Sequence, residues 1–533
     1  MRHRGICQVA VVAVLSLLLS PSLLAADCGP SPYDCAVSYI GRHDLPAAIQ
    51  SLNEVLQQSP RNLKALNLLG IALTESGRVE QANSKFKTAL EIDPSFYPAR
   101  KNLAINEFDQ HLFPQAAADL NRVLQQAPGD AIVHIYLAEI SFQKDDFPSA
   151  LKHYEKGSAR ITARPAWMLH YAECLAAQGD KARAVSLLQA LPANDSADRF
   201  QGGLLLGRAG AYAEAAALFA SARKNYADPY LAAYNQLLML IRAAQYPAAI
   251  NLFNQLVSEG YGRAELYNLV SEAYLKSGDV KQAYDSLRTA TKIEPSAEQN
   301  YVDLAALCLD DQDYDLGLEI LDVGLHYVPN SYRLLVQRGF MLVMRGRMDD
   351  AEKQFLAAST IAPNKTLPYI ALGEVWMQAG QAQKAADMLR VKARLPATDF
   401  LIQYVYAEAL IRSGAEIGTP AAVEAMQALQ TSIRLDPKFA HAHAELGKLL
   451  MKSGDTERAI PELKLATQLD PEDSGPFYQL GQAYRKTGQK AEADEMLARV
   501  AQLHSPEHEM DVNKELRRLV KLDTASSETE AKP

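Results

Sequence analysis

One feature of this sequence constrains its fold more than any other: a period of 34 residues runs through almost the whole chain. A small residue, followed four positions later by a large apolar one, recurs at Ala48, Ala82, Ala116, Ala150, Ala184, Ala215, Ala249, Ala283, Gly317, Ala351, Ala385, Ala425, Ala459 and Ala493. Only two steps differ from 34, namely 31 before Ala215 and 40 before Ala425. Units of this length cannot bury their apolar faces alone and must stack on their neighbours. The chain is therefore predicted to form one continuous stack instead of about three or four globular domains.

Each repeat predicts a pair of helices. Ala82, Phe86 and Ala89 are spaced i, i+4 and i+7, which places them on one stripe of a helix. Gly70 lies on an earlier apolar helix, and small residues on both helices allow the two to approach closely. Gly77 is expected to end the first helix in a left-handed conformation. The same frame holds Gly179, Gly210, Gly278, Gly346, Gly380, Gly414, Gly454 and Gly488, whereas most units without this glycine start their second helix with Pro46, Pro114, Pro148 or Pro247.

This pattern resembles the tetratricopeptide repeat (TPR) family. Two units that carry the resemblance well read LKALNLLGIALTESGRVEQANSKFKTALEIDPSF (63–96) and AHAHAELGKLLMKSGDTERAIPELKLATQLDPED (440–473). The resemblance implies an all-α solenoid in which about fourteen pairs of antiparallel helices stack into a right-handed superhelix. It also implies a binding function, because TPR proteins usually bind partners on the concave face that the first helix of each pair lines.

The phase of the repeat divides the chain into predicted segments. A signal peptide at 1–26 and an N-terminal arm at 27–33 precede the repeats, and a capping helix at 508–522 and a disordered tail at 523–533 follow them. The fourteen TPR-like units span 29–507, as 29–62, 63–96, 97–130, 131–164, 165–195, 196–229, 230–263, 264–297, 298–331, 332–365, 366–399, 400–439, 440–473 and 474–507. The extra residues of unit 400–439 lie near Gly414–Pro420 and predict a longer turn.

The capping helix is predicted because the last unit of a solenoid would otherwise expose its apolar face. Val512, Leu516, Leu519 and Val520 share one face of this segment, with charged residues between them. A helix lying on a membrane surface is the alternative interpretation. The tail TASSETEAKP is polar and is expected to be disordered.

The N-terminal segment has the features of a secretory signal peptide. A basic start at Arg2–Arg4 precedes an apolar stretch from Val9 to Leu19, and cleavage is expected after Ala25 or Ala26. An uncleaved anchor and a lipoprotein are the alternatives. An exported chain can form disulfides, and Cys28 and Cys35 are separated by an arm that could fold back. A Cys28–Cys35 bond and two free thiols both remain open.

Ten side chains are predicted to line the binding groove. By the resemblance, positions 5, 6 and 9 of each unit point inward, and they include Glu139, Glu173, Tyr234, Glu272, Asp303, Glu374, Tyr404, Glu408, Glu445 and Tyr478. An acidic groove with tyrosines favours basic or extended polar partners and repels acidic ones. The alternative is that these carboxylates only solvate the helices or pair with neighbouring side chains.

Charge and motifs argue against nucleic-acid binding and against catalysis. Lys and Arg number 54 against 63 Asp and Glu, so the basic excess of a nucleic-acid binder is missing. His504 and His508 match the H-x-x-E-H spacing of one class of zinc peptidase, but Pro506 separates them and no domain surrounds them. His441 and His443 lie two apart on a helix and face different directions. No cofactor and no metal are expected, and Cys174 and Cys308 are predicted to fill the core.

These features predict a non-catalytic protein-binding scaffold or adaptor of the bacterial cell envelope. Exported to the periplasm or associated with the envelope, it would recognise a partner protein or peptide in the concave groove. A TPR component of the machinery for exopolysaccharide synthesis or secretion is the alternative, and a zinc metallopeptidase is a remote one. Contact with the membrane is expected only through an uncleaved signal or through a partner.

Overall fold

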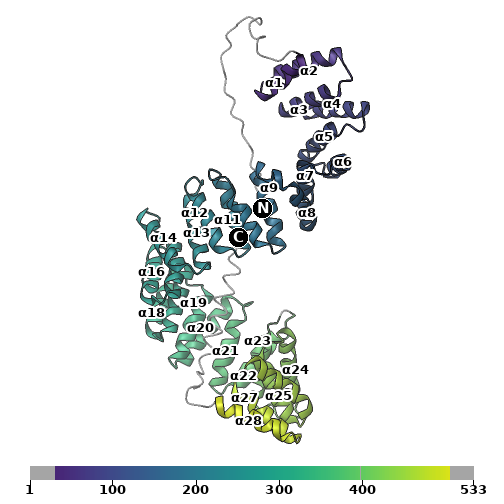
Figure 1. Cartoon of the computed structure of the whole chain (residues 1–533). Helices are drawn as coiled ribbons and strands as arrows, with labels where there is room; N and C mark the ends of the chain where they lie inside the picture. The colour runs from purple at the N-terminus through teal and green to yellow at the C-terminus, as the bar shows by residue number, and fades with distance from the viewer. Residues whose placement is uncertain (1–30, 397, 504–533) are drawn as a thin grey trace. The chain divides into compact units, whose positions relative to one another are not determined.

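The computed structural model describes residues 31–396 and 398–503. Within these ranges the fold is all-α, with 28 α-helices, one 3-10 helix and no strand, so the predicted fold class is confirmed (Figure 1). The predicted signal peptide, the capping helix, the tail, Cys28 and the 504–508 motif lie outside the described residues. None of the described helices combines the length and the apolar character that a bilayer crossing requires.

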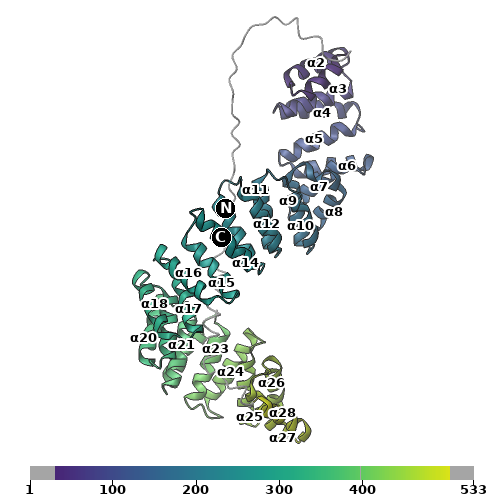
Figure 2. The same cartoon turned by 60° about the vertical axis from the view of Figure 1, so that its left-hand side comes forward.

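The chain divides into two compact units between Gln245 and Tyr246. The first unit contains α1 (Pro32–Gly41), α2 (Leu45–Gln58), α3 (Leu63–Glu75), α4 (Val79–Ile92), α5 (Tyr97–Asp109), α6 (Phe113–Gln126), α7 (Ala131–Phe142), α8 (Phe147–Gly157), η1 (Ser158–Ala163), α9 (Pro165–Ala177), α10 (Lys181–Gln189), α11 (Ser196–Arg208), α12 (Tyr212–Arg223) and α13 (Pro229–Arg242). Figure 2 shows these helices in chain order.

The second unit contains α14 (Tyr246–Ser258), α15 (Ala264–Lys276), α16 (Val280–Ile293), α17 (Glu298–Asp310), α18 (Tyr314–Tyr327), α19 (Tyr332–Met344), α20 (Met348–Ile361), α21 (Leu367–Gln378), α22 (Ala382–Ala393), α23 (Phe400–Arg412), α24 (Pro420–Leu435), α25 (Ala440–Ser453), α26 (Thr456–Leu469), α27 (Ser474–Lys486) and α28 (Lys490–Leu503). Odd-numbered helices are the first helices of the predicted pairs, and even-numbered helices are the second ones.

The turn inside each pair is built around one left-handed residue. Gly77 has φ +78°, and the next residue, Arg78, donates its N–H to the Leu73 carbonyl, which closes the helix end. All nine glycines of the predicted frame have positive φ, which confirms their predicted role. In the five pairs without this glycine the same place holds His43, His111, Asp145, Ala244 and Gln312, with φ between 55° and 61°.

The start of many second helices is set by an aspartate just before them. Asp44 accepts a hydrogen bond from the Ala47 N–H at 3.2 Å, which satisfies one of the free donors at the helix N-terminus. The same position of the repeat holds Asp146, Asp180, Asp279, Asp313 and Asp455, each of which caps its helix in this way. Short local signals therefore place the helix boundaries.

Small residues on first helices accept large residues from second helices, as predicted. A Cβ at Gly70 would lie 2.3 Å from Phe86 Cε1, and a Cβ at Gly339 would lie 2.4 Å from Phe355 Cε1. Both phenylalanines are fully buried. Truncating such a residue to alanine costs about 3–5 kcal/mol, so these contacts are a main source of stability.

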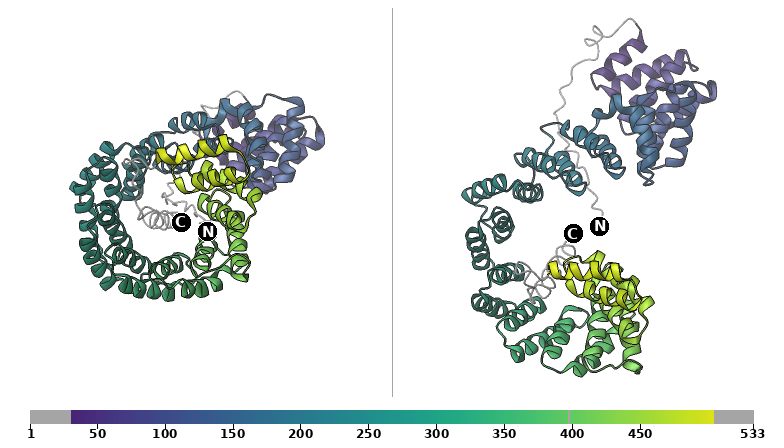
Figure 3. Two further views of the ribbon diagram at one scale, coloured as in Figure 1. Left: turned by 90° about the horizontal axis from the view of Figure 1, so that it is seen from below. Right: turned by 60° about the horizontal axis from the view of Figure 1, so that its bottom comes forward.

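First helices also pack on one another. Within the first unit α3 contacts α5, α5 contacts α7, and α7 contacts α9; within the second unit α17 contacts α19, α19 contacts α21, and α21 contacts α23. Figure 3 shows the helix pairs of the second unit side by side in chain order. In each unit the first helices therefore form a wall, and the side chains on it are the candidates for binding.

Candidate binding face on the first helices

All ten predicted groove residues lie on first helices, within α7, α9, α13, α15, α17, α21, α23, α25 and α27. Their surroundings differ widely. Glu272 is exposed, and Tyr478 is 47% exposed, whereas Glu139 is only 4% exposed. Glu173, Tyr234, Asp303, Glu374, Tyr404, Glu408 and Glu445 are half-buried. The repeat phase therefore identifies the helix of each residue without fixing how open each side chain is.

The structure departs from the sequence expectation at Glu139, whose carboxylate is internal. The Tyr154 hydroxyl donates to Glu139 Oε1 at 2.5 Å, and His170 Nδ1 lies 2.9 Å from Oε2. Burial first, and then the Glu139 charge, raise the pKa of Tyr154, so this hydroxyl keeps its proton and remains a donor. Glu139 ties α7 to α8 and α9 and is not an open groove carboxylate.

Aromatic side chains close the wall around α7. Tyr136 packs edge-on against Phe108 of α5 at 5.1 Å and against Trp167 of α9 at 6.1 Å between ring centroids. The guanidinium of Arg164 lies 4.9 Å from the Trp167 ring, a cation–π contact. Tyr136 and Trp167 are both buried. In the sequence, the signal was the run AIVHIYLAEISF, which is apolar nearly all round and is typical of a buried helix.

In the second unit, several of the predicted acidic residues have nearby partners. Asp303 accepts hydrogen bonds from Asn268 at 2.7 Å and from Gln299 at 2.6 Å. Glu408 pairs with Arg412 at 2.5 Å, and Glu445 pairs with Lys448 at 2.9 Å. These three carboxylates therefore follow the alternative interpretation, in which they pair with neighbouring side chains.

The charge around Arg412 shows that these groups interact over more than one helix. Burial lowers the pKa of Arg412, but the Glu408 and Glu374 carboxylates outweigh this and raise the pKa overall. Glu374 lies on α21 and Glu408 on α23, so an arginine on α23 is held between acids of two first helices. This stretch of the wall carries mixed charge.

Polar side chains also bridge neighbouring first helices at a spacing that the sequence analysis missed. Asn67 accepts from Asn102 at 3.0 Å, and Arg333 donates to Gln299 at 2.8 Å, just as Asn268 donates to Asp303. The pairs are separated by 34 or 35 residues. Polar residues one repeat apart were therefore the signal that could have revealed them.

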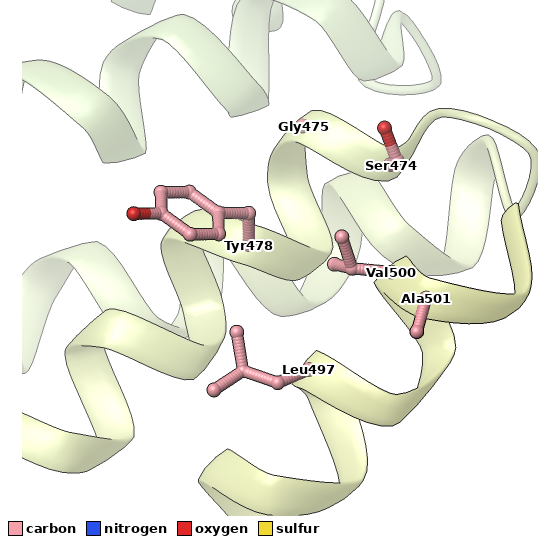
Figure 4. Close-up of a pocket in the computed structure, with 6 residues that line it drawn as sticks. All are labelled: Ser474, Gly475, Tyr478, Leu497, Val500 and Ala501. Carbon is pink, nitrogen blue, oxygen red and sulfur yellow. The ribbon is translucent and has the colours of Figure 1, made fainter. Parts of the chain in front are cut away.

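The predicted tyrosines have different roles. Tyr404 packs edge-on against Phe439, with 5.1 Å between ring centroids. Tyr478 stands at the mouth of a cavity between α27 and α28, which Ser474, Gly475, Leu497, Val500 and Ala501 also line (Figure 4). Of these two, Tyr478 is the more available to a further chain segment.

Family models for the tetratricopeptide repeat match residues 33–95, 73–140, 141–205, 264–296, 421–474 and 450–507. The chain belongs to the tetratricopeptide repeat family. Among curated proteins, the peroxisomal targeting signal receptor of Saccharomyces cerevisiae is 34% identical over 83 residues, or 16% of this chain. The match spans only 14% of the length of that receptor.

Solved TPR structures resemble the chain at low sequence identity. Yeast Tom70 gives a TM-score of 0.40 at 16% identity, over 88% of this chain and 98% of Tom70. Cut9–Hcn1 of the APC/C gives 0.35 at 12% identity, over 84% of this chain and 95% of that chain. MamA gives 0.27 at 22% identity, over 31% of this chain and 93% of MamA.

The two histidines of α25 that the sequence analysis considered as metal ligands, His441 and His443, contact neighbouring groups of the TPR chain. His443 is buried, with Nδ1 2.6 Å from Glu462 and Nε2 3.1 Å from the Pro437 carbonyl. His441 stacks on Phe439, with 5.5 Å between ring centroids. The described residues include no group of three or more His, Cys, Asp and Glu side chains placed to hold a metal ion.

The predicted core cysteines are confirmed. Cys174 and Cys308 are buried free thiols, and burial raises their pKa values to about 12 and about 11. A thiol that stays protonated is a poor nucleophile, which fits a packing role. Cys35 is disulfide-bonded. Because Cys28 lies outside the described residues, the Cys28–Cys35 pairing stays a prediction.

Proposed function

We propose that this TPR chain is a non-catalytic scaffold that is exported to the cell envelope and binds a partner protein or peptide on the first helices of its second unit. The family supports the binding role, since TPR proteins generally mediate protein–protein interactions. The observation that carries the proposal is the exposure of Glu272 on α15 and of Tyr478 on α27, both on first helices of the second unit.

Burial excludes α7 from the proposed site, and the two predicted groove residues that are exposed, Glu272 and Tyr478, both lie in the second unit. On α7 every residue from Val133 to Ile140 is buried, so this helix offers a partner no open polar side chain there. On α15, by contrast, Glu272 is exposed, and Glu374 on α21 is half-buried. A carboxylate that remains in water keeps its long-range field and can steer a basic partner. The expected partner is therefore a basic or extended polar segment of a protein.

Export rests on the sequence of residues 1–26, with its basic start, apolar stretch and small residues before Asp27. Cell fractionation combined with N-terminal sequencing tests it. A mature chain beginning at Ala26 or Asp27 in the periplasmic fraction is expected. An intact Met1 on cytoplasmic protein would contradict the envelope location.

A crosslinked pull-down from living cells, with a C-terminal tag, identifies the partner. Mass spectrometry and a glycan stain are applied to the same eluate. One or two stoichiometric envelope proteins are the expected result. Recovery of a polymer, or of its synthase and export components, would instead support the exopolysaccharide role.

Substitutions on the identified complex then test the site. The double variant Glu272→Gln and Glu374→Gln should weaken binding and flatten its dependence on salt, because screened charges contribute less at high ionic strength. Glu319→Gln is the matched control, since Glu319 is exposed on α18, a second helix. Equal effects of the two changes, or none from the first, would overturn the proposed face.

A further inference from the structure

Exposed apolar side chains end successive second helices of the second unit. They stand ten residues after the small residue that marks each repeat, and we call them the outer row: Ile293, Tyr327, Ile361, Leu395 and Leu435. Each is 40–51% exposed. Four of them are the last residues of α16, α18, α20 and α24, and Leu395 follows the end of α22 by two residues. Because first and second helices alternate in direction, these ends lie along one edge of the unit, and Figure 2 shows α16, α18 and α20 following one another along one side of it.

The first unit has mostly polar side chains at the same position of the repeat. Five of its six pairs have an exposed polar residue there: Gln58, Gln126, Arg160, Asn194 and Asn225. Only Ile92 is apolar. The stacking of repeats therefore does not require an apolar residue at this position. The outer row is also confined to the middle of the second unit, since α14 has Glu259 at this position and Leu503 of α28 is buried.

Further exposed apolar residues widen this edge. Val323, Leu356 and Val391, which lie four or five residues before members of the outer row, are 50%, 42% and 66% exposed. Eight large apolar residues at about half exposure offer on the order of 800 Å², which is the area that each partner contributes to a protein interface of standard size. The largest apolar patch on a typical monomer measures only about 300–600 Å². The exposed area of this edge is therefore enough for a stable interface.

We propose that the outer row binds the outer row of a second copy of this chain, around a two-fold axis near Ile361. The row has one member per repeat, at steps of 34 residues up to Leu395. The longer step to Leu435 comes from the turn 413–419 and the longer start of α24, which lie at the opposite edge of the unit. A regularly spaced row matches itself when a two-fold axis reverses it, and this is the commonest symmetry of protein dimers. Ile361 would meet its own copy, Tyr327 would meet Leu395, and Ile293 would meet Leu435.

The charges beside the outer row favour a second copy over a lipid surface. At the centre of the row, Thr360 and Ala362 flank Ile361 and carry no charge. The two ends carry one base and one acid each: Lys292 and Glu294, and Arg434 and Asp436. An apolar centre with a charged rim is the anatomy of a protein interface, and each end of one copy can form ion pairs with the opposite end of the other. An anionic lipid surface would instead favour bases without acids. Of the inner flanking residues that can carry charge, His326 and Arg394, the latter already pairs with Glu424 at 3.4 Å.

Cysteine crosslinking in the full-length chain tests the two-fold arrangement. The described free thiols, Cys174 and Cys308, are buried, and the parent chain gives the background. Ile361→Cys should form a disulfide-linked dimer on mild oxidation, because this residue meets its own copy. Ile293→Cys and Leu435→Cys should link only when the two variants are mixed. Self-linking of Ile293→Cys as efficient as that of Ile361→Cys, or no linking of Ile361→Cys above the background, would overturn the proposal.

Analytical ultracentrifugation measures the dimer without a crosslink. The native chain should dimerise reversibly, and Tyr327→Asp with Leu395→Asp should raise the dissociation constant by about tenfold or more, because like charges would be buried opposite each other. Leu112→Asp with Leu231→Asp is the matched control and should leave the constant unchanged, since these leucines are 42% and 40% exposed in the first unit. A native chain that is monomeric at every concentration, or a dimer that both double variants affect equally, would refute the interface. Because the outer row lies on second helices, that result would leave the proposed binding face of the first helices untouched.

Discussion

The buried carboxylate of Glu139 is the sharpest test of how the first unit is held together. Replacing it with alanine leaves the fully buried Tyr154 hydroxyl without its acceptor and removes the partner of His170. Each hydrogen bond to a carboxylate contributes about 1.5–3 kcal/mol, so losing the two that Glu139 makes should cost about 3 kcal/mol or more. Tyr154→Phe, which removes one hydrogen bond to the same carboxylate, should cost about 1.5–3 kcal/mol.

Hydrogen exchange measures this cost locally, which suits a repeat protein whose unfolding is not two-state. About 3 kcal/mol corresponds to roughly a hundredfold rise in the opening equilibrium. Exchange should rise by that factor in α7, α8 and α9, which the Glu139 contacts join. It should not change in α25 to α28, because repeats contact only their neighbours.

Glu173 is the matched control, since it lies at the same repeat position on α9 and is half-buried. Glu173→Ala should change exchange by less than about threefold, as surface substitutions usually do. If Glu139→Ala left exchange unchanged and instead weakened binding of the partner, the carboxylate would belong to the groove. The argument from burial would then be wrong.

Two other predictions concern single positions and pH. Gln312→Gly should stabilise α17 and α18 by about 1 kcal/mol, because Gln312 has φ +60° and residues with a side chain are strained in this conformation. Hydrogen exchange in α17 and α18 should therefore become slower, and unchanged or faster exchange would contradict this prediction. Burial, with the charges of His134 and Lys156, lowers the pKa of His153. Burial also acts to lower the pKa of His443, but its hydrogen bonds to Glu462 and the Pro437 carbonyl, together with the Glu462 and Asp436 charges, outweigh burial and raise that pKa. When the pH is lowered from about 7.5 to 5.5, hydrogen exchange, corrected for its intrinsic pH dependence, should rise in α7–α8 and fall in α25–α26. The same trend in both pairs would refute the assignment of these effects to His153 and His443.

The sign of that pH dependence follows from proton uptake. In the unfolded chain His153 takes up a proton as the pH falls through about 6.5. In the folded chain its lowered pKa delays this protonation until the pH is lower. Acid therefore favours the opened form of α7–α8. The stability that His443 contributes is fully present below the same pH and is lost as the pH rises through its raised folded pKa. His153→Glu should remove the acid sensitivity of α7–α8, because it recreates the pairing that Glu462 provides.

The fold was predictable from the sequence because its signals are local and repeated. The spacing of Ala82 and Phe86 identifies the packed stripe, and Gly77 marks the turn, each within a few residues. Repetition made the phase certain even where one signal was missing. At Asp145 and Gln312 the turn keeps its left-handed residue without glycine, since the helices on either side hold it in place.

The candidate site was less predictable because exposure depends on neighbouring repeats. Phase alone correctly placed Glu139 and Glu272 on first helices, yet one is buried and the other exposed. The difference comes from the packing around α7, where Tyr136 of α7 contacts Phe108 of α5 and Trp167 of α9. Such packing depends on how successive pairs are rotated, which the repeat phase does not give; at α7 the signal was the apolar run 131–142.

One contact between repeats shows how a fixed frame accommodates different chemistry. Arg100, His134 and His443 occupy the same position of their units, and each donates to the carbonyl of the proline before its helix: Pro94, Pro128 and Pro437. Because a carbonyl can only accept, Nε2 of both histidines carries a proton. Nδ1 of each then faces a residue at one shared position of the second helix.

The group at that shared position determines the chemistry of each contact. Asp119 pairs with Arg100 at 2.9 Å, and Glu462 lies 2.6 Å from His443, so both contacts favour a positive charge on the first helix. At His134 the facing group is His153, with 3.0 Å between the two Nδ1 atoms, where Nδ1 of a neutral His134 must accept a hydrogen bond from the Nδ1–H of His153. A second proton would set two N–H groups against each other. The same backbone geometry therefore supports an acid-stabilised contact in one repeat and an acid-sensitive one in another, and a single residue on the second helix decides between them.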